Sequence, residues 1–126
     1  MAIIHRPDYL REAFGGFDAE NDKDAALKFA LYILAVDDRI DRLLNLMAPK
    51  VRAASIGGDP GWEIERRELT DLEGYEEWPE GATVHASVDP RGFELGHPDF
   101  YCDHPTFFEY AQKIVLAYIK HFKQGS

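Results

Sequence analysis

Cysteine and long apolar runs are both scarce in this sequence of 126 residues. Cys102 is its single cysteine, so no disulfide can form within the chain, and a reducing, cytoplasmic setting is expected. The longest apolar stretch, residues 25–36, includes Lys28 and is too short for a membrane-spanning helix, which needs about twenty residues. The apolar stretch before His5 is likewise too short for the core of a signal peptide. We therefore expect a cytoplasmic protein that does not enter a membrane.

Positive charge is also in short supply, since 14 Lys and Arg stand against 23 Asp and Glu and give a net charge of −9. This balance argues against nucleic acids and anionic membrane surfaces as partners, and it favours a basic protein. Catalytic signatures are missing as well: the sequence has no glycine-rich phosphate loop, no Ser-His-Asp ordering and no HExxH motif. We accordingly expect a protein that is not an enzyme and that needs no cofactor.

Material for a hydrophobic core is plentiful by contrast, because 45% of the residues are hydrophobic and 13% are aromatic. A chain of this length and composition folds as one domain, which we place at residues 1–124. The final Gly125-Ser126 pair is set aside as a potential cloning remnant.

Helical signals dominate the first part of the chain. A short helix is expected from about residue 7 to Gly15-Gly16, and a longer one over residues 25–36 with Asn21 as its N-cap. Apolar residues surround nearly the whole of this longer helix, which should therefore lie at the centre of the fold. After a kink at Asp37-Asp38 the apolar pattern becomes one-sided, and it stops at Pro49.

Strand and turn signals follow. Strands are expected over residues 51–56, 62–69 and 82–88, with a break at residues 57–61 between the first two. The clearest is 82–88, in which small or branched apolar residues alternate with polar ones. A turn then leads into Phe93 and Leu95, which completes an antiparallel meander of three to four strands.

The chain ends in a broad apolar stripe at helical spacing, which extends to Phe122 and begins at a capping box formed by Thr106 and Glu109. Helices and strands are thus segregated along the sequence instead of alternating. This order predicts an α+β domain, with N-terminal helices, one of them long and central, a middle antiparallel sheet, and an amphipathic C-terminal helix packed on that sheet.

The negative charge is concentrated in residues 59–80, which hold nine acidic side chains and two arginines, a net charge of −7. Residues 1–58 and 81–126 each carry only −1. Two tryptophans lie in the acidic segment, and Trp, Tyr and Arg are typical anchors of protein interfaces. The competing interpretation places both tryptophans in the core, beside a solvated acidic turn. The predicted partner-binding residues are Trp62, Glu63, Glu65, Asp71, Glu73, Tyr75, Glu76, Glu77 and Trp78.

A small metal-dependent enzyme is the alternative function. Asp37, Asp38 and Asp41 spell DDxxD, a pattern with which helical prenyl-diphosphate enzymes hold Mg²⁺. Such enzymes need a large all-helical cavity, which a short chain rich in strands does not provide. A plain helix-surface ion pair between Asp38 and Arg42 explains the pattern as well.

A second metal candidate is formed by residue types that bind zinc, although their spacing fits no familiar zinc motif. Its members are His97, Cys102 and His104.

Four acidic side chains alternate ahead of the predicted central helix: Asp18, Glu20, Asp22 and Asp24. They resemble the start of a calcium loop, but Lys23 and Phe29 occupy the positions at which an EF-hand requires glycine and a bidentate acid. We therefore expect no calcium site here, and we assign no metal-binding residue.

The stretch from Phe93 to Phe122, with HPDFY followed by FFEYAQKIVLAYIKHF, resembles the carboxyl-terminal part of small bacterial immunity proteins. These are encoded beside polymorphic or contact-dependent growth-inhibition toxins. The resemblance covers about a quarter of the chain and implies neutralisation of a cognate toxin domain in the cytosol. It transfers no binding residue by position. An acidic surface would suit a basic toxin, for example a nuclease, and residues 63–78 are the candidate.

Overall fold

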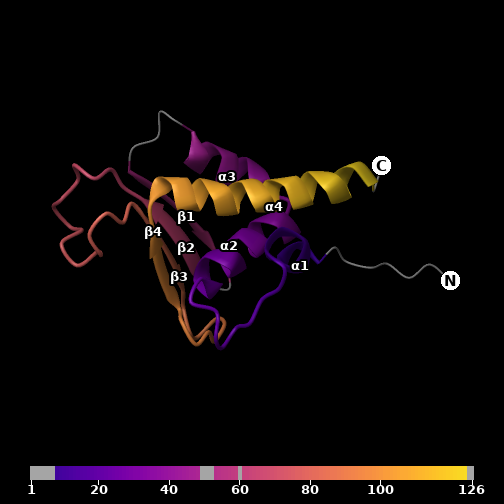
Figure 1. Cartoon of the computed structure of the whole chain (residues 1–126), viewed down its shortest axis with the longest axis horizontal. Coiled ribbons are helices and arrows are strands. Elements are labelled where there is room, and N and C mark those ends of the chain that lie inside the picture. The colour runs from indigo at the N-terminus through magenta and orange to yellow at the C-terminus, as the bar shows by residue number, and fades with distance from the viewer. Residues whose placement is uncertain (1–7, 49–52, 60, 125–126) are drawn as a thin grey trace.

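Three helices, a four-stranded sheet and a long fourth helix follow one another in the described part of the chain (Figure 1). The computed structural model describes residues 8–48, 53–59 and 61–124. It confirms the predicted α+β class as a single domain. Its elements are α1 (Tyr9–Phe14), α2 (Ala25–Val36), α3 (Ile40–Met47), β1 (Ala54–Gly58), β2 (Trp62–Arg66), β3 (Val84–Val88), β4 (Asp99–Cys102) and α4 (His104–Gln124).

The first two helices begin and end at polar or glycine residues. The Asp8 carboxylate accepts the Arg11 N–H at 3.1 Å and caps α1, which ends at Gly15 in the left-handed region. The predicted N-cap of α2 is wrong. Asn21 donates its side-chain amide to Asp18, and α2 begins after Asp24 with no side-chain cap. Local hydrogen bonding to Asp18 thus competes with capping, as is common for Asn ahead of a helix.

The predicted kink between the second and third helices is a complete break. Asp38 adopts a φ of 57°, and its N–H donates to Ala35 while the Arg39 N–H donates to Leu34. This is the Schellman arrangement, in which a left-handed residue ends a helix and satisfies its last carbonyls. Tyr118 of α4 donates its hydroxyl to the Asp38 carboxylate at 2.8 Å. The helix that follows, α3, begins at Ile40, which is buried.

The strands form an antiparallel meander in the order β1-β2-β3-β4. One row across the sheet consists of Ile56, Ile64, Ala86 and Phe100, and it faces the helices. The neighbouring row on the opposite, outer face consists of Ser55, Glu65, His85 and Tyr101. The alternation predicted for residues 82–88 is confirmed, since Val84, Ala86 and Val88 are buried.

Several predicted strand limits are wrong. β1 includes Gly57 and Gly58, which the sequence suggested as part of a break, and residues 51–52 lie outside the described residues. β2 ends at Arg66, three residues before the predicted end. The last strand is β4, not the segment after the turn. Phe93 instead stacks on Phe29 of α2, with ring centroids 4.5 Å apart, so its apolar surface covers a helix.

The core lies between the inner face of the sheet and the helices. Eight of the twelve residues of α2 are buried, which confirms the predicted central position of this helix. The long helix α4 packs against α1 and α2, and it begins beside the sheet, where His104 meets Arg66 of β2. The predicted capping box is wrong: Asp103 accepts the Thr106 N–H at 2.9 Å, so the helix begins earlier. The Phe122 side chain lies outside the described residues.

Candidate protein-binding surface

The outer face of the sheet carries no helix in the described part of the chain, because the four helices lie on the inner side (Figure 1). The segment between β2 and β3, residues 67–83, carries six of the nine acidic side chains of segment 59–80, and we call it the acidic loop. Although it has no regular secondary structure, part of it folds back onto the outer face of the sheet.

Aromatic rings hold the acidic loop against the sheet. His85 of β3 and Tyr101 of β4 are cross-strand partners, and their rings stack at 4.2 Å with an interplanar angle of 4°. Trp78 of the loop lies edge-on to both, with ring centroids 5.6 Å and 5.5 Å away. Tyr75 meets Trp78 edge-on at 4.9 Å. These four rings form a small second core outside the main one, so the loop is positioned by packing.

Arg67 holds the acidic loop together through hydrogen bonds to its backbone. Its Nε donates to the Ala82 carbonyl at 3.0 Å and its Nη1 to the Asp71 carbonyl at 2.8 Å. The guanidinium carbon also lies 5.3 Å from the centre of the Tyr75 ring and 5.2 Å from that of Trp78. Only 5% of Arg67 is exposed. One buried cation thus joins both ends of the loop and supports two of its rings.

The neighbouring Arg66 points to the other side of the sheet and is also 5% exposed. Its guanidinium donates to the Leu46 carbonyl at 2.7 Å and to His104 at 2.6 Å, and it lies over the Phe108 ring. Burial, together with the positive charge of Arg66, lowers the pKa of His104. A neutral His104 can therefore accept the Arg66 Nε–H.

The burial of these two arginines changes the charge of the surface. They are the only basic residues of segment 59–80, and both are withdrawn from solvent. None of the nine acidic side chains in the segment is buried. The exposed side chains of this segment therefore carry negative charge without a compensating cation. The negative potential at this surface is stronger than the net charge of −7 for the segment indicates.

Most predicted partner-binding residues belong to this surface. Glu63 is exposed on the outer face of β2, and the half-buried Glu65 accepts the Tyr75 hydroxyl at 3.1 Å. Burial and the adjacent Glu65 raise the pKa of Tyr75. The other predicted members that lie at the surface are Asp71, Glu73, Glu76, Glu77 and Trp78.

Trp62 is the exception, because it faces the helices and is only 5% exposed. The interpretation that places the tryptophans in the core therefore holds for Trp62, which does not belong to the predicted binding surface. The two tryptophans differ because Trp62 occupies an inward position of a strand, whereas Trp78 lies in a loop that covers the outward side chains of β3 and β4.

Residues outside the acidic loop complete the surface and were not identified from the sequence. His85 and Tyr101 supply the platform for Trp78, and Asp99 of β4 lies 2.8 Å from His85. Burial, followed by the charge of Asp99, raises the pKa of Tyr101. A cavity of about 510 Å³ opens on the outer face beside Glu63 and Asp99. The alternation in β3 could have indicated His85, but no local signal shows that β4 pairs with it.

Neither proposed metal cluster is assembled. Among the described residues, no group of three His, Cys, Asp or Glu side chains is placed to hold a metal ion. Asp41 pairs with Arg39 at 3.5 Å. The expected Asp38–Arg42 pair is wrong, because Arg42 donates to the Gly57 carbonyl instead.

The three residues of the proposed zinc cluster, His97, Cys102 and His104, lie in different environments. Burial raises the pKa of the Cys102 thiol to about 12, and His104 bonds to Arg66. His97 is exposed. These surroundings favour neither zinc binding nor a reactive thiolate.

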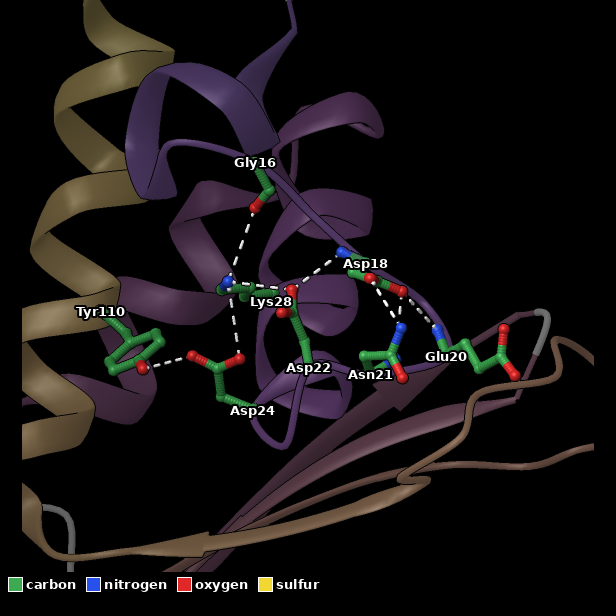
Figure 2. A network of polar contacts seen from close by, with 8 residues as sticks. All are labelled: Gly16, Asp18, Glu20, Asn21, Asp22, Asp24, Lys28 and Tyr110. Carbon is green, nitrogen blue, oxygen red and sulfur yellow. Dashed lines mark hydrogen bonds and ion pairs between the residues drawn. The ribbon is translucent and has the colours of Figure 1, made fainter.

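Lys28 pairs with two of the four acidic residues that resembled a calcium loop, Asp22 and Asp24 (Figure 2). Lys28 Nζ lies 3.1 Å from Asp22, 3.5 Å from Asp24 and 3.5 Å from the Gly16 carbonyl. Asp24 also accepts the hydroxyl of Tyr110, so the network joins α2 to α4. Burial and the hydrogen bond to Asp24 raise the pKa of this tyrosine. The carboxylates of Asp22 and Asp24 therefore compensate an internal cation, and Asp24 also links α2 to α4, whereas the Asp18 carboxylate accepts hydrogen bonds within its own turn.

Comparison of the chain with protein-family models, with curated protein sequences and with solved structures gives no match. Across the described residues, none of the helices combines the length and apolar character needed to cross a membrane.

Proposed function

We propose that this chain is an immunity protein, which binds and neutralises a cognate bacterial toxin domain in the cytoplasm without catalysing a reaction. The observation that carries the proposal is the acidic loop together with the outer face of the sheet. There, exposed carboxylates surround an aromatic cluster while both nearby arginines are buried. A basic protein, such as the nucleic-acid-binding cleft of a nuclease toxin, has the complementary charge.

Two physical properties of this surface suit a rapid and tight inhibitor. Uncompensated negative charge attracts a basic partner over several ångströms and accelerates association. The half-buried Trp78 and Tyr75 provide rigid aromatic anchors, since their rings already pack on the sheet and on Arg67. A surface that is ordered before binding loses less conformational entropy in the complex.

The charge contribution is tested with two variants that change net charge equally. The first replaces Glu73, Glu76 and Glu77 of the acidic loop by Lys. The control replaces three exposed acids elsewhere by Lys: Glu20, Glu94 and Glu109. The partner to be tested is the carboxyl-terminal domain of a large secreted protein, which the proposal expects to be encoded beside this chain. We expect the loop variant to associate about tenfold more slowly or worse at low salt, and with a weaker salt dependence. The control should remain close to the unmodified chain.

Stopped-flow mixing at several salt concentrations measures these rates. Equal effects of the two variants would show that only total charge matters, and would remove the acidic loop from the proposal. In cells, co-expression of the chain should restore growth during production of the toxin domain, and the loop variant should restore it poorly. If no adjacent gene encodes such a secreted protein, or if the chain neither binds its terminal domain nor protects cells, the immunity function is wrong.

A further inference from the structure

A separate cavity of about 340 Å³ lies on the helix side of the sheet, where the end of α2 and the start of α3 meet the β1–β2 hairpin. Ile33 and Leu34 give it an apolar wall. Gly58, which has no side chain, and Trp62 contribute from the sheet. None of the residues that line this cavity belongs to the acidic loop, so a ligand bound here is separate from the function proposed for that loop.

Trp62 brings a buried hydrogen-bond donor to this cavity. The residue is 5% exposed, and its indole Nε1 has no hydrogen-bond acceptor among the described residues. A Cβ atom built on Gly58 would lie 3.3 Å from Nε1 and 3.5 Å from both Cε2 and Cζ2, so the absence of a side chain at Gly58 leaves this side of the indole ring uncovered. Buried polar groups are nearly always paired in folded proteins, and an indole N–H can only donate. This donor therefore calls for a ligand atom that accepts a hydrogen bond.

The remaining charged side chains at the cavity occur in equal numbers of each sign. Arg39 and Arg42 come from the start of α3, and Arg42 uses one of its five N–H groups on the Gly57 carbonyl. Asp37 and Asp59 are exposed carboxylates at the same cavity. Guanidinium groups bind carboxylates well, and a carboxylate attracts an ammonium group.

We propose that this cavity binds a free α-amino acid with an apolar side chain. The ligand carboxylate accepts hydrogen bonds from the Trp62 indole and from Arg39 or Arg42. Its ammonium group meets Asp37 or Asp59, and its side chain lies along Ile33 and Leu34. A zwitterion is neutral overall, so it matches a cavity whose own charged side chains balance, whereas a simple anion or cation leaves one pair unmatched.

The two tryptophans of the chain make a direct test, because a protein labelled with ¹⁵N at indole nitrogens gives one signal from Trp62 and one from Trp78. The apolar L-amino acids are titrated separately to about 10 mM, above the roughly 1 mM dissociation constant that a few polar contacts support. At least one should shift the Trp62 signal with saturation while the Trp78 signal stays in place. For leucine, 4-methylpentanoate and 3-methylbutylamine, which lack the ammonium and carboxylate groups respectively, should bind about tenfold more weakly or worse.

Three variants locate the site. Gly58→Ala places a methyl group beside the indole N–H, and its strand position requires no positive φ, so folding should survive while binding is lost. Arg39→Gln and Trp62→Phe each remove donors and should weaken binding about tenfold or more. Arg11→Gln, an exposed change on α1, is the control and should leave binding unchanged.

The proposal is overturned if none of the amino acids produces a saturable shift of the Trp62 signal. It is also overturned if either leucine analogue binds as tightly as leucine, or if Gly58→Ala binds as well as the unmodified chain while keeping its native spectrum. Loss of amino-acid binding in these variants, with toxin binding unchanged, would support this site separately from the immunity function.

Discussion

Replacement of Arg67 by Met is the most direct test of how the acidic loop is held. Met keeps an apolar stem of similar length but removes the hydrogen bonds to the Ala82 and Asp71 carbonyls. It also removes the cation from the rings of Tyr75 and Trp78. The change therefore breaks the polar link between the two ends of the loop without opening a large cavity.

The size of the effect follows from these contacts. A hydrogen bond to a charged donor contributes about 1.5 kcal/mol or more when buried. A partly desolvated cation–π contact contributes about 0.5–1 kcal/mol. Opening of the loop lets water reach the freed carbonyls and recovers part of this loss. We therefore expect the free energy of unfolding to fall by about 3 kcal/mol and the melting temperature by roughly 10 °C for a chain of this size.

Urea unfolding followed by circular dichroism and by tryptophan fluorescence measures the loss. The free energy of unfolding of Arg67→Lys should lie between those of the unmodified chain and Arg67→Met. A lysine keeps the charge but lacks the planar group that reaches both carbonyls. Arg11→Met is the matched control: Arg11 is exposed on α1, and its replacement should leave the free energy of unfolding almost unchanged. If Arg67→Met costs less than about 1 kcal/mol, Arg67 does not organise the loop, and the argument for a preformed surface fails.

Three further outcomes are expected. Phe107→Ala, which truncates a side chain with 0% exposure, should lower the free energy of unfolding by about 3–5 kcal/mol in urea titrations, and a loss below about 2 kcal/mol would contradict its central position. Cys102, with a pKa of about 12, should react with a thiol reagent at pH 8 roughly a hundredfold more slowly than in the urea-unfolded chain, and equal rates would contradict its burial. Hydrogen bonding to Arg91 lowers the pKa of Asp89 from 3.8 to about 2, so its stabilising contribution is present above pH 3.8 and is lost as the pH falls towards 2. A carboxyl NMR titration should show this midpoint, and Arg91→Gln should return it towards 3.8.

Much of the fold could be predicted because local patterns and tertiary packing agree. The nearly continuous apolar surface of residues 25–36 is that of a helix enclosed on several sides, and α2 occupies this position. The alternation in residues 82–88 likewise corresponds to the buried and outward positions of β3. Element ends were less predictable, because several side-chain caps compete for the same backbone groups. Asp103, not Thr106, begins α4, and Asn21 bonds to Asp18 instead of capping α2.

The candidate surface could be predicted only in part. The concentration of acidic residues in 59–80 is a property of composition, and it is visible without a structure. The direction in which each side chain points cannot be seen from the composition. Two adjacent arginines point to opposite faces of the sheet and both become buried, and Trp62 and Trp78 end on opposite sides as well. A shift of one residue in strand register would move Trp62 and Arg66 of β2 to the other face, and pairing between distant segments fixes the register.

The sequence by itself determined the class of the fold, the central helix and the place of the negative charge, because each depends on neighbouring residues. Only the tertiary structure decided which charges remain exposed and which rings support them. The sequence shows that Arg67 is basic, but it does not show that this residue is buried. Its carbonyl partners lie four and fifteen residues further along the chain. Their meeting converts a mixed sequence segment into a surface of one sign, because burial removes the cations and leaves the carboxylates in water.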